Sequence, residues 1–311
     1  MTTRSFTDLV GCALPLQLAG MGSVSSVELA SAVTDAGGLG MLGVAGISAA
    51  VVEERLAVLS KSTSGPVGAN FIVPFLDVDA VKLASRRCRV VEFFYGDPDA
   101  ALVDIVHDGG ALASWQVGSA DEAFAAVDAG CDLVVVQGIE AGGHVRGVVT
   151  LADVLASTVG GFPVPLVAAG GVGTASDVAA QLNAGASAVR VGTRFVAAEE
   201  SKAHSAYVDA LIEAAAGDTM LTEVFSLGWP NAPHRVLRSC VAAAEVASSE
   251  IVGTVSADGS EWPVPRFSTI PPTKDAAGNI DAMALYAGFS VDAVKRRQPA
   301  AEIVAEMFER V

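Results

Sequence analysis

"VPLVAAGGVGTASDVAAQLNAGASAVRVGTRF" (164–195) contains two short apolar runs, 165–171 and 188–195, on either side of an alanine-rich segment. The first run ends on the pair Gly170 and Gly171. The segment between the runs begins on threonine and ends on glycine, as helices commonly do. A strand, a helix and a second strand at this spacing predict one βα unit of a parallel sheet.

The same plan recurs along the chain, at a pitch of roughly 20 to 30 residues per unit. Hydrophobic residues make up 51% of the chain, charged residues 17%, and the mean hydropathy is +0.49. This composition suits strands that are buried on both faces. Eight units within about 200 residues predict an α/β fold, the (β/α)8 or TIM barrel. The predicted strands are 14–20, 38–44, 66–73, 89–96, 111–117, 132–138, 165–171 and 188–195.

A doubly wound open sheet is the competing topology. It would place a GxGxxG turn after the first strand and an acidic residue at the end of the second. "AGMGSVSS" (19–26) is a poor match to that turn, and "MLGVAGIS" (41–48) contains no carboxylate. The barrel is therefore favoured.

The remainder of the chain has a different pattern. Residues 201–215, 234–250 and 281–311 are expected to be helical, whereas the proline-rich segment 256–279 has no periodicity and is expected to be a long loop, a lid or wall over a site. We therefore expect a barrel over residues 1–200. We expect 201–311 to form a mostly helical C-terminal extension that packs on the barrel as part of the same unit.

Charge and cysteine content exclude several classes of protein. A net charge of −16 argues against nucleic-acid or anionic-membrane partners. The uncharged stretch 154–176 is long enough to span a bilayer, but its glycines and prolines would break a helix. The four cysteines form no CxxC pair and the four histidines have no metal-ligand spacing. We expect a cytoplasmic protein with reduced thiols and no metal, and a homo-oligomer is compatible with the sequence.

Glycines follow the seventh and eighth predicted strands. In barrels of this kind the active site lies at the carboxyl ends of the strands, and the loops after strands seven and eight commonly bind phosphate. Gly170 and Gly171 precede one helix, and Gly192 with Thr193 precedes another. Backbone N–H groups and helix N-termini there favour a phosphorylated ligand over simple tight turns.

Small residues and amides follow other strands. "AGMG" (19–22) and "EAGGH" (140–144) leave room for a planar ring, and Asn70 and Gln137 each offer an amide to its polar edges. This pattern suits flavin mononucleotide (FMN) better than a nicotinamide dinucleotide.

Three stretches carry a resemblance to a known family: "AGMGSVSSVELASAVTDAGGLGMLG" (19–43), "QGIEAGGHVRG" (137–147) and residues 164–201. Together they resemble the nitronate monooxygenases, formerly called 2-nitropropane dioxygenases, and the related flavin-dependent enoyl-ACP reductases. The resemblance covers about residues 10–205, with a weaker motif at "MALYAGFS" (283–290).

The resemblance implies an FMN enzyme and assigns roles to individual residues. It implies that His144 is the catalytic residue, and that Phe289 stands where relatives commonly have glutamine. The implied FMN contacts comprise the ring neighbours Met21, Gly22, Gly142 and Gly143, the edge amides of Asn70 and Gln137, and the phosphate site of Gly170, Gly171, Gly192 and Thr193.

An imidazole with a pKa close to working pH can move protons beside a flavin. In a nitronate monooxygenase His144 would act as the base that takes the proton from the carbon bearing the nitro group, before oxidation with O2, whereas a nitronate supplied as its anion would need no base. In an NAD(P)H-dependent reductase of an enoyl-ACP or enoyl-CoA thioester it would hold the thioester oxygen. A flavin-binding protein without turnover is a third hypothesis.

Other polar and aromatic residues have competing interpretations. Glu140 could bond amides of its own loop, and Arg146 could reach an anionic substrate or solvent. His234 and Arg235 are expected to begin a helix. Trp115 and Trp262 are considered as walls of a substrate pocket or as core residues.

Overall fold

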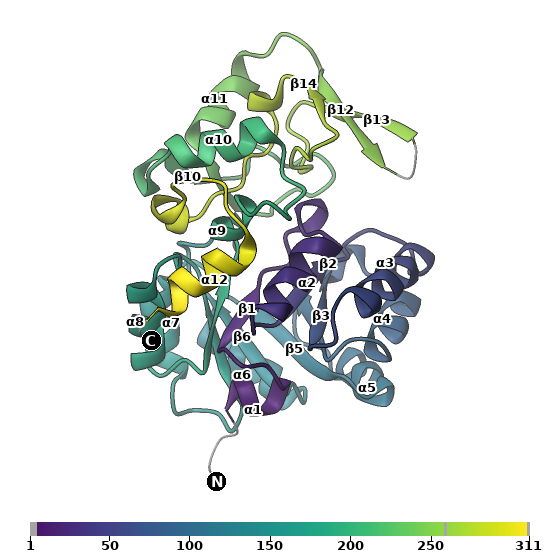
Figure 1. The fold of residues 1–311 in the computed structure, drawn as a ribbon, viewed down its shortest axis with the longest axis vertical. Helices are drawn as coiled ribbons and strands as arrows, with labels where there is room; N and C mark the ends of the chain where they lie inside the picture. The colour runs from purple at the N-terminus through teal and green to yellow at the C-terminus, as the bar shows by residue number, and fades with distance from the viewer. Residues whose placement is uncertain (1–4, 258–259, 310–311) are drawn as a thin grey trace.

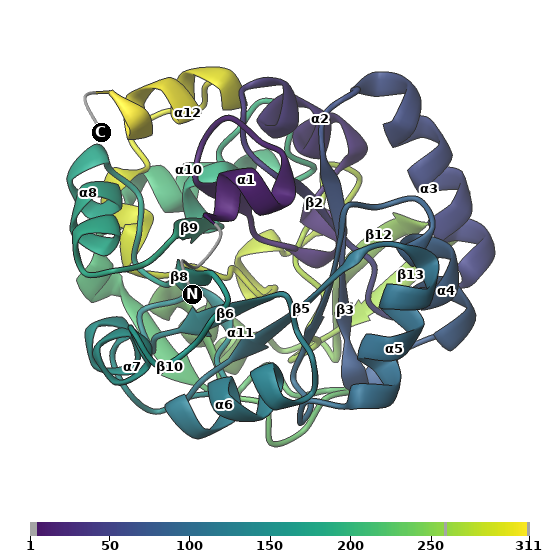
Figure 2. The same ribbon diagram turned by 90° about the horizontal axis from the view of Figure 1, so that it is seen from below.

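The computed structural model describes residues 5–257 and 260–309. Eight parallel strands form one sheet in the order β1-β9-β8-β6-β5-β4-β3-β2, and a parallel bridge between Gln17 and Leu39 joins its two edges. The predicted barrel is confirmed, and Figure 2 shows the strands ringed by helices. The barrel strands are β1 (Leu16–Leu18), β2 (Gly40–Gly43), β3 (Val67–Ile72), β4 (Val90–Phe94), β5 (Leu112–Val117), β6 (Leu133–Gln137), β8 (Leu166–Ala169) and β9 (Ala188–Val191).

Helices cover the outside of the barrel. Four of them begin on a Ser or Thr whose side chain accepts a backbone N–H three residues on, the pattern expected from the sequence. The helices are α2 (Val27–Asp35), α3 (Ala49–Ser62), α4 (Val78–Ser85), α5 (Ala100–Gly109), α6 (Ala120–Asp128), α7 (Leu151–Thr158), α8 (Ala175–Asn183) and the short α9 (Thr193–Val196).

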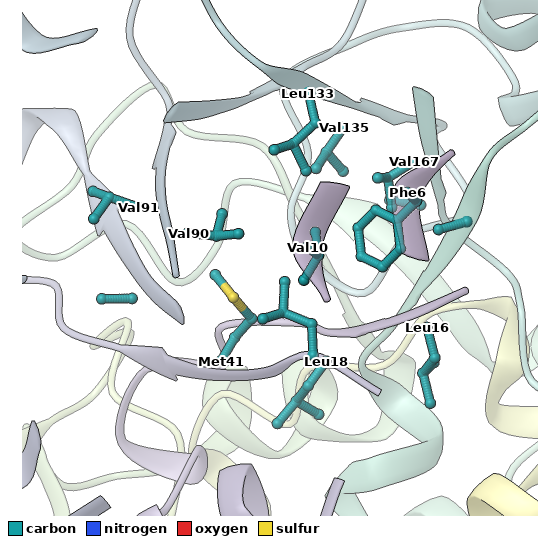
Figure 3. Packing of buried hydrophobic residues seen from close by; sticks show 14 of the residues in the cluster. Phe6, Val10, Leu16, Leu18, Met41, Val90, Val91, Leu133, Val135 and Val167 are labelled. Carbon is teal, nitrogen blue, oxygen red and sulfur yellow. The ribbon is translucent and has the colours of Figure 1, made fainter. Parts of the chain in front are cut away.

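The amino-terminal helix α1 (Phe6–Val10) closes the lower end of the barrel. Phe6 and Val10 are buried in the main apolar cluster, next to Leu16, Leu18 and Val167 (Figure 3). The same cluster includes the buried face of α12 (Ala300–Phe308), which packs against α2 and α8. Figure 1 shows α12 lying along the barrel while the rest of the extension stands above it. The extension thus supplies the helix that fills the gap between α8 and α2.

The extension contains more strand than its sequence suggested. The expected helix at 201–215 is present as α10 (Ser205–Glu213), followed by β10 (Thr219–Thr222). The expectation that His234 and Arg235 begin a helix is wrong: they lie in β11 (His234–Leu237), and α11 (Arg238–Val246) starts only afterwards. β11 pairs antiparallel with β10 and with β7 (Gly143–His144), so these residues have ladder partners and are not free to start a helix.

The segment 256–279 is also not simply a loop. It continues an antiparallel hairpin of β12 (Ile251–Ala257) and β13 (Ser260–Pro265), and β14 (Ala277–Gly278) pairs with β12. In 281–311, α12 is the only α-helix among the described residues, and the preceding part forms single 3-10 turns, η4 (Ile280–Ala282) and η5 (Phe289–Ala293). The remaining 3-10 turns are η1 (Gly22–Val24), η2 (Val73–Phe75) and η3 (Ala216–Asp218). No helix in the described part of the chain is long and apolar enough to cross a membrane.

Candidate active site

One large cavity, of about 980 Å³, opens at the carboxyl ends of the barrel strands. Its wall is shared by the loops after the strands and by parts of the extension, including the β12–β13 hairpin. All eleven residues to which sequence analysis gave a site role line it: Met21, Gly22, Asn70, Gln137, Gly142, Gly143, His144, Gly170, Gly171, Gly192 and Thr193. The structure thus brings the predicted set together, while their individual roles stay predictions.

The loop after β6 is held from both ends. The Gln137 side chain donates from Nε2 to the His144 carbonyl (3.0 Å) and accepts from the Arg146 N–H (3.3 Å). In the extension, β11 pairs with this loop so that His234 stands opposite His144. The Gln137 amide is expected at the edge of a flavin ring. In the structure it holds the backbone that carries His144.

The two glycines before His144 allow backbone positions that a residue with a side chain could not adopt without strain. A Cβ at Gly142 would lie 2.5 Å from the Gly288 nitrogen and 2.9 Å from the Thr193 hydroxyl, so only glycine lets the extension approach this closely. Gly143 has φ +76°, in the left-handed region. Gly288 also donates its N–H to the Thr193 hydroxyl (3.0 Å), so the loops after β6 and β9 meet the extension at one point.

His144 stands in an aromatic box. Its ring stacks on Trp229 with centroids 3.9 Å apart, and Tyr95, His234 and Tyr286 surround it with centroids 5.9, 5.3 and 5.7 Å away. Its Nε2 atom is buried and has no hydrogen-bond partner among the described residues. Nδ1 is therefore the ring nitrogen left to meet a ligand without rearrangement.

Burial in this box, together with a smaller effect of the neighbouring His234, lowers the pKa of His144 to about 3. The expectation of a pKa close to working pH is therefore wrong, because the apolar box disfavours the imidazolium ion. His144 is a neutral and weakly basic imidazole at neutral pH.

His234 is held in one form by its own hydrogen bonds. It is fully buried, its Nδ1 bonds the Ala232 carbonyl (2.9 Å) and its Nε2 accepts the Phe225 N–H (3.2 Å). These partners require the proton on Nδ1. Burial also lowers the pKa of His234. It is a structural support of the box and has no ring nitrogen free for chemistry.

The floor of the cavity is polar. Asn70 donates from Nδ2 to the buried carboxylate of Glu92 (2.8 Å), which leaves its Oδ1 as the group available to a ligand. Gly20 lies so close that a Cβ there would be 2.6 Å from the Asn70 Cβ. Arg190, paired with Glu92, and Gln116 also line the cavity.

The expected phosphate loops lie at one side of the cavity. Gly170 and Gly171 have φ of +123° and +71°, conformations that favour glycine. In contrast, the α8 N-terminus is already capped, because Asp177 accepts the N–H groups of Gly173 and Thr174. An anion there would meet the glycine loop and Thr193, not the first turn of α8.

The residues with competing interpretations mostly have structural roles. Glu140 accepts the Leu151 N–H (2.9 Å), a role in loop structure, and Arg146 forms ion pairs with Glu122 and Asp97. Trp115 is a core residue, fully buried, whereas Trp262 lines the cavity and is 58% exposed. Phe289 packs under the Arg235 guanidinium, 4.6 Å from its ring centre.

Sequence reasoning missed four residues of the site: Tyr95, Trp229, Glu92 and Arg190. Tyr95 directly follows β4 and has φ +65°, which is rare for a residue with a Cβ and common at functional sites. Its place after a strand, and the charge of Glu92 inside an apolar run, were the available signals. Trp229 lies in a turn-rich loop far along the chain, and nothing in its sequence context indicated that it belongs to the site.

Comparison with known proteins places these features in a family. The profile of nitronate monooxygenases matches residues 3–82 and 76–310. The chain is 28% identical, over 363 aligned positions, to the nitronate monooxygenase of Paraburkholderia phytofirmans, covering 98% of this chain and 94% of that one. It resembles the structure of FabK from Thermotoga maritima with a TM-score of 0.80 and 27% identity, covering 99% of this chain and 96% of that one.

A further relative carries a different activity in its name. The chain is 32% identical over 236 residues to a Mycobacterium tuberculosis protein named (3aS,4S,5R,7aS)-5-hydroxy-7a-methyl-1-oxo-octahydro-1H-indene-4-carboxyl-CoA dehydrogenase. The match covers 75% of this chain and 65% of that relative's length. With the profile spanning nearly the whole chain, the protein is an oxidoreductase and belongs to the nitronate monooxygenase family.

Proposed function

We propose that this protein is an FMN-dependent nitronate monooxygenase that oxidises alkyl nitronates with O2. The observation that carries the proposal is a neutral histidine, His144, at the wall of a glycine-lined cavity on the barrel mouth. Family membership supports the same chemistry.

The residues present fit FMN. The left-handed glycines Gly170 and Gly171 and the Thr193 hydroxyl suit the phosphate, and the Asn70 Oδ1 atom suits a ring N–H. Gln116 has a buried Oε1 without a partner among the described residues, a second acceptor that a ring N–H would satisfy. A bound flavin would supply the capacity to accept electrons from the substrate.

The low basicity of His144 bears on the substrate. A base with a pKa near 3 is poorly matched to the carbon acid of a neutral nitroalkane, because proton transfer works best when the base titrates near the operating pH. A nitronate arrives already deprotonated and needs only a binding partner. Neutral His144 can donate a hydrogen bond from Nδ1 to a nitronate oxygen. We therefore place nitronates ahead of neutral nitroalkanes as substrates.

A second candidate is an NAD(P)H-dependent oxidoreductase of an acyl thioester. The cavity continues outward to Arg55, Lys202 and Trp262, and neither cation forms an ion pair with a described residue. Two cations in the lining of one cavity, on a chain of net charge −16, suit the phosphates of a coenzyme A group. The 32% identity to the CoA-thioester dehydrogenase favours the same substrate class.

The two candidates separate in one experiment. The purified protein loaded with FMN is mixed anaerobically with ethyl nitronate, and separately with NADH and NADPH, while the flavin absorbance is followed. Bleaching by the nitronate alone supports the monooxygenase, and bleaching by a nucleotide alone supports the thioester oxidoreductase. A chain that takes up no FMN would overturn both.

We further infer that barrel and extension act as one unit, because both line the cavity and α12 packs on the barrel. The four cysteines are free thiols, which supports a cytoplasmic location.

A further inference from the structure

An ion pair lies inside the barrel at the floor of the cavity. The Arg190 Nη1 group of β9 donates to Glu92 Oε1 of β4, across the barrel interior. The two side chains are 6% and 0% exposed. Arg190 lines the cavity, whereas Glu92 does not, so the cation faces the ligand space and the carboxylate lies behind it.

Glu92 organises the side chains around it. Its Oε1 atom also accepts from Asn70 Nδ2 (2.8 Å), and its Oε2 atom accepts from Gln17 Nε2 (2.8 Å) and, more weakly, from the Ser114 hydroxyl (3.5 Å). Because a carboxylate can only accept, Asn70 must turn its NH2 group down and its oxygen toward the cavity. One carboxylate therefore fixes both a cation and an amide at the floor.

Such a pair is weak evidence for stability by itself. The free-energy cost of removing two charges from water offsets much of their mutual attraction. A pair of apolar residues of similar size often stabilises a fold equally well. A charged pair in this place therefore suggests a role toward the ligand. A cation near a redox-active ring stabilises the form that carries more negative charge, and the nearby carboxylate reduces that effect.

We propose that Arg190 and Glu92 together set the electron affinity of a flavin bound in this cavity. Arg190 supplies the positive charge that favours the reduced, anionic ring over the oxidised one. Glu92 is a positioning residue that holds the guanidinium and Asn70 in place and moderates the charge. The inference rests on the proposed FMN site and adds the residues that tune it.

Charge-neutralising variants test this pairing. Arg190→Gln removes the positive charge at the floor, so reduced FMN should bind about tenfold more weakly relative to oxidised FMN. Glu92→Gln leaves the positive Arg190, so the same ratio should move about tenfold the other way. The glutamine side chain in the second variant keeps its hydrogen bonds, because the unpartnered Oε1 of Gln17 can turn to accept from it. The double variant removes both charges, so its ratio should lie between the ratios of the two single variants.

The ratio is measured as the midpoint potential of bound FMN in a dye-coupled reduction titration, together with fluorescence binding of oxidised FMN. Arg89→Gln is the matched control: it removes the same charge beside the start of β4, where Arg89 bonds backbone carbonyls of α1 at the closed end of the barrel. Its potential should stay at the wild-type value.

Three results decide the matter. Opposite shifts in the two single variants, with the double variant between them, support the proposal. Equal potentials in all variants that bind FMN would overturn it and leave the proposed function standing. Failure of the unmodified chain to bind FMN would overturn both, and variants that fail to fold are recognised by circular dichroism and replaced by Arg190→Lys, which should keep the wild-type potential.

Discussion

The imidazole of His144 and the indole of Trp229 stack with centroids 3.9 Å apart and planes 24° from parallel. His144 follows a barrel strand, whereas Trp229 comes from the extension, and Trp229 also meets Tyr95 edge-on at 4.7 Å. The extension thus completes the environment of the candidate catalytic residue. The low pKa of His144 depends on a residue from a distant part of the chain.

Replacing Trp229 should therefore change the titration of His144. In Trp229→Ala, water reaches the imidazole and the pKa of His144 should rise by about one unit or more, because burial is its main cause. The measurement is an NMR titration of the His144 ring protons. Trp229→Phe keeps an aromatic face and should leave the pKa near the wild-type value. An unchanged pKa in the alanine variant would mean that the rest of the box excludes water by itself.

His144 should also leave a signature in the acid stability of the protein. Its folded pKa of about 3 lies below its usual value of 6.5, so the unfolded chain binds more protons between these limits. The stabilisation from neutral His144 is complete above pH 6.5 and is lost as the pH falls toward 3.

Replacing His144 with Gln should flatten this dependence by up to about 1.4 kcal/mol per pH unit. Urea unfolding at a series of pH values between the folded and unfolded pKa measures the slope. Parallel slopes for wild type and His144→Gln would contradict the low pKa.

Gly142 should tolerate no side chain. In Gly142→Ala the new methyl group would meet the Gly288 nitrogen at 2.5 Å and force the loop away from the extension. We expect a loss of about 1–3 kcal/mol in the free energy of unfolding. Because Gly217 has open space around its Cβ position, Gly217→Ala is a matched control and should be close to neutral. Equal stability of the two variants in urea unfolding would show that the loop moves at no cost.

Gly20 tests the amide at the cavity floor. A methyl group at position 20 would lie 2.6 Å from the Asn70 Cβ and displace that side chain. Gly20→Ala should therefore weaken FMN binding about tenfold, the loss of one good hydrogen bond to a buried group. Fluorescence quenching of free FMN gives the dissociation constant. Asn70→Ala should show a similar loss, and an additive effect in the double variant would argue against a shared cause.

Trp262 distinguishes the two substrate classes. It is 58% exposed and lines the cavity from β13 of the extension, whereas His144 lines it from the loop after β6. Trp262→Ala should raise KM severalfold for an acyl-CoA while leaving KM for ethyl nitronate unchanged. Steady-state kinetics with both substrates decide this. A loss restricted to the nitronate would place the small substrate in the outer cavity.

The barrel could be predicted from sequence because its strands are buried on both faces and appear as unbroken apolar runs. The hairpin could not, because the prolines Pro263 and Pro265 are typical of loops. β13 is an edge strand, where proline removes no ladder hydrogen bond that the sheet needs. β11 was missed since it passes directly into α11 and the two share one apolar pattern.

The site divides in the same way. Gly170 directly follows β8, and His144 lies in the loop region after β6, so both are located by the rule that active sites lie at the carboxyl ends of barrel strands. Trp229 and Arg190 act through contacts between segments that are distant in the sequence. The hydrophobic periodicity of the sequence does not show which segments come into contact. The pKa of His144 was predicted wrongly for the same reason: the groups that bury it come from the end of β4 and from the extension.

The position of α12 has a consequence for how the chain is made. The groove between α2 and α8 is covered by a helix that follows β9 only after the whole of α10, α11 and the β12–β13 hairpin. During synthesis on the ribosome, the apolar surfaces of α2 and α8 therefore remain exposed until α12, which is translated much later, can cover them. Chaperone binding to the nascent barrel should persist until α12 has left the exit tunnel.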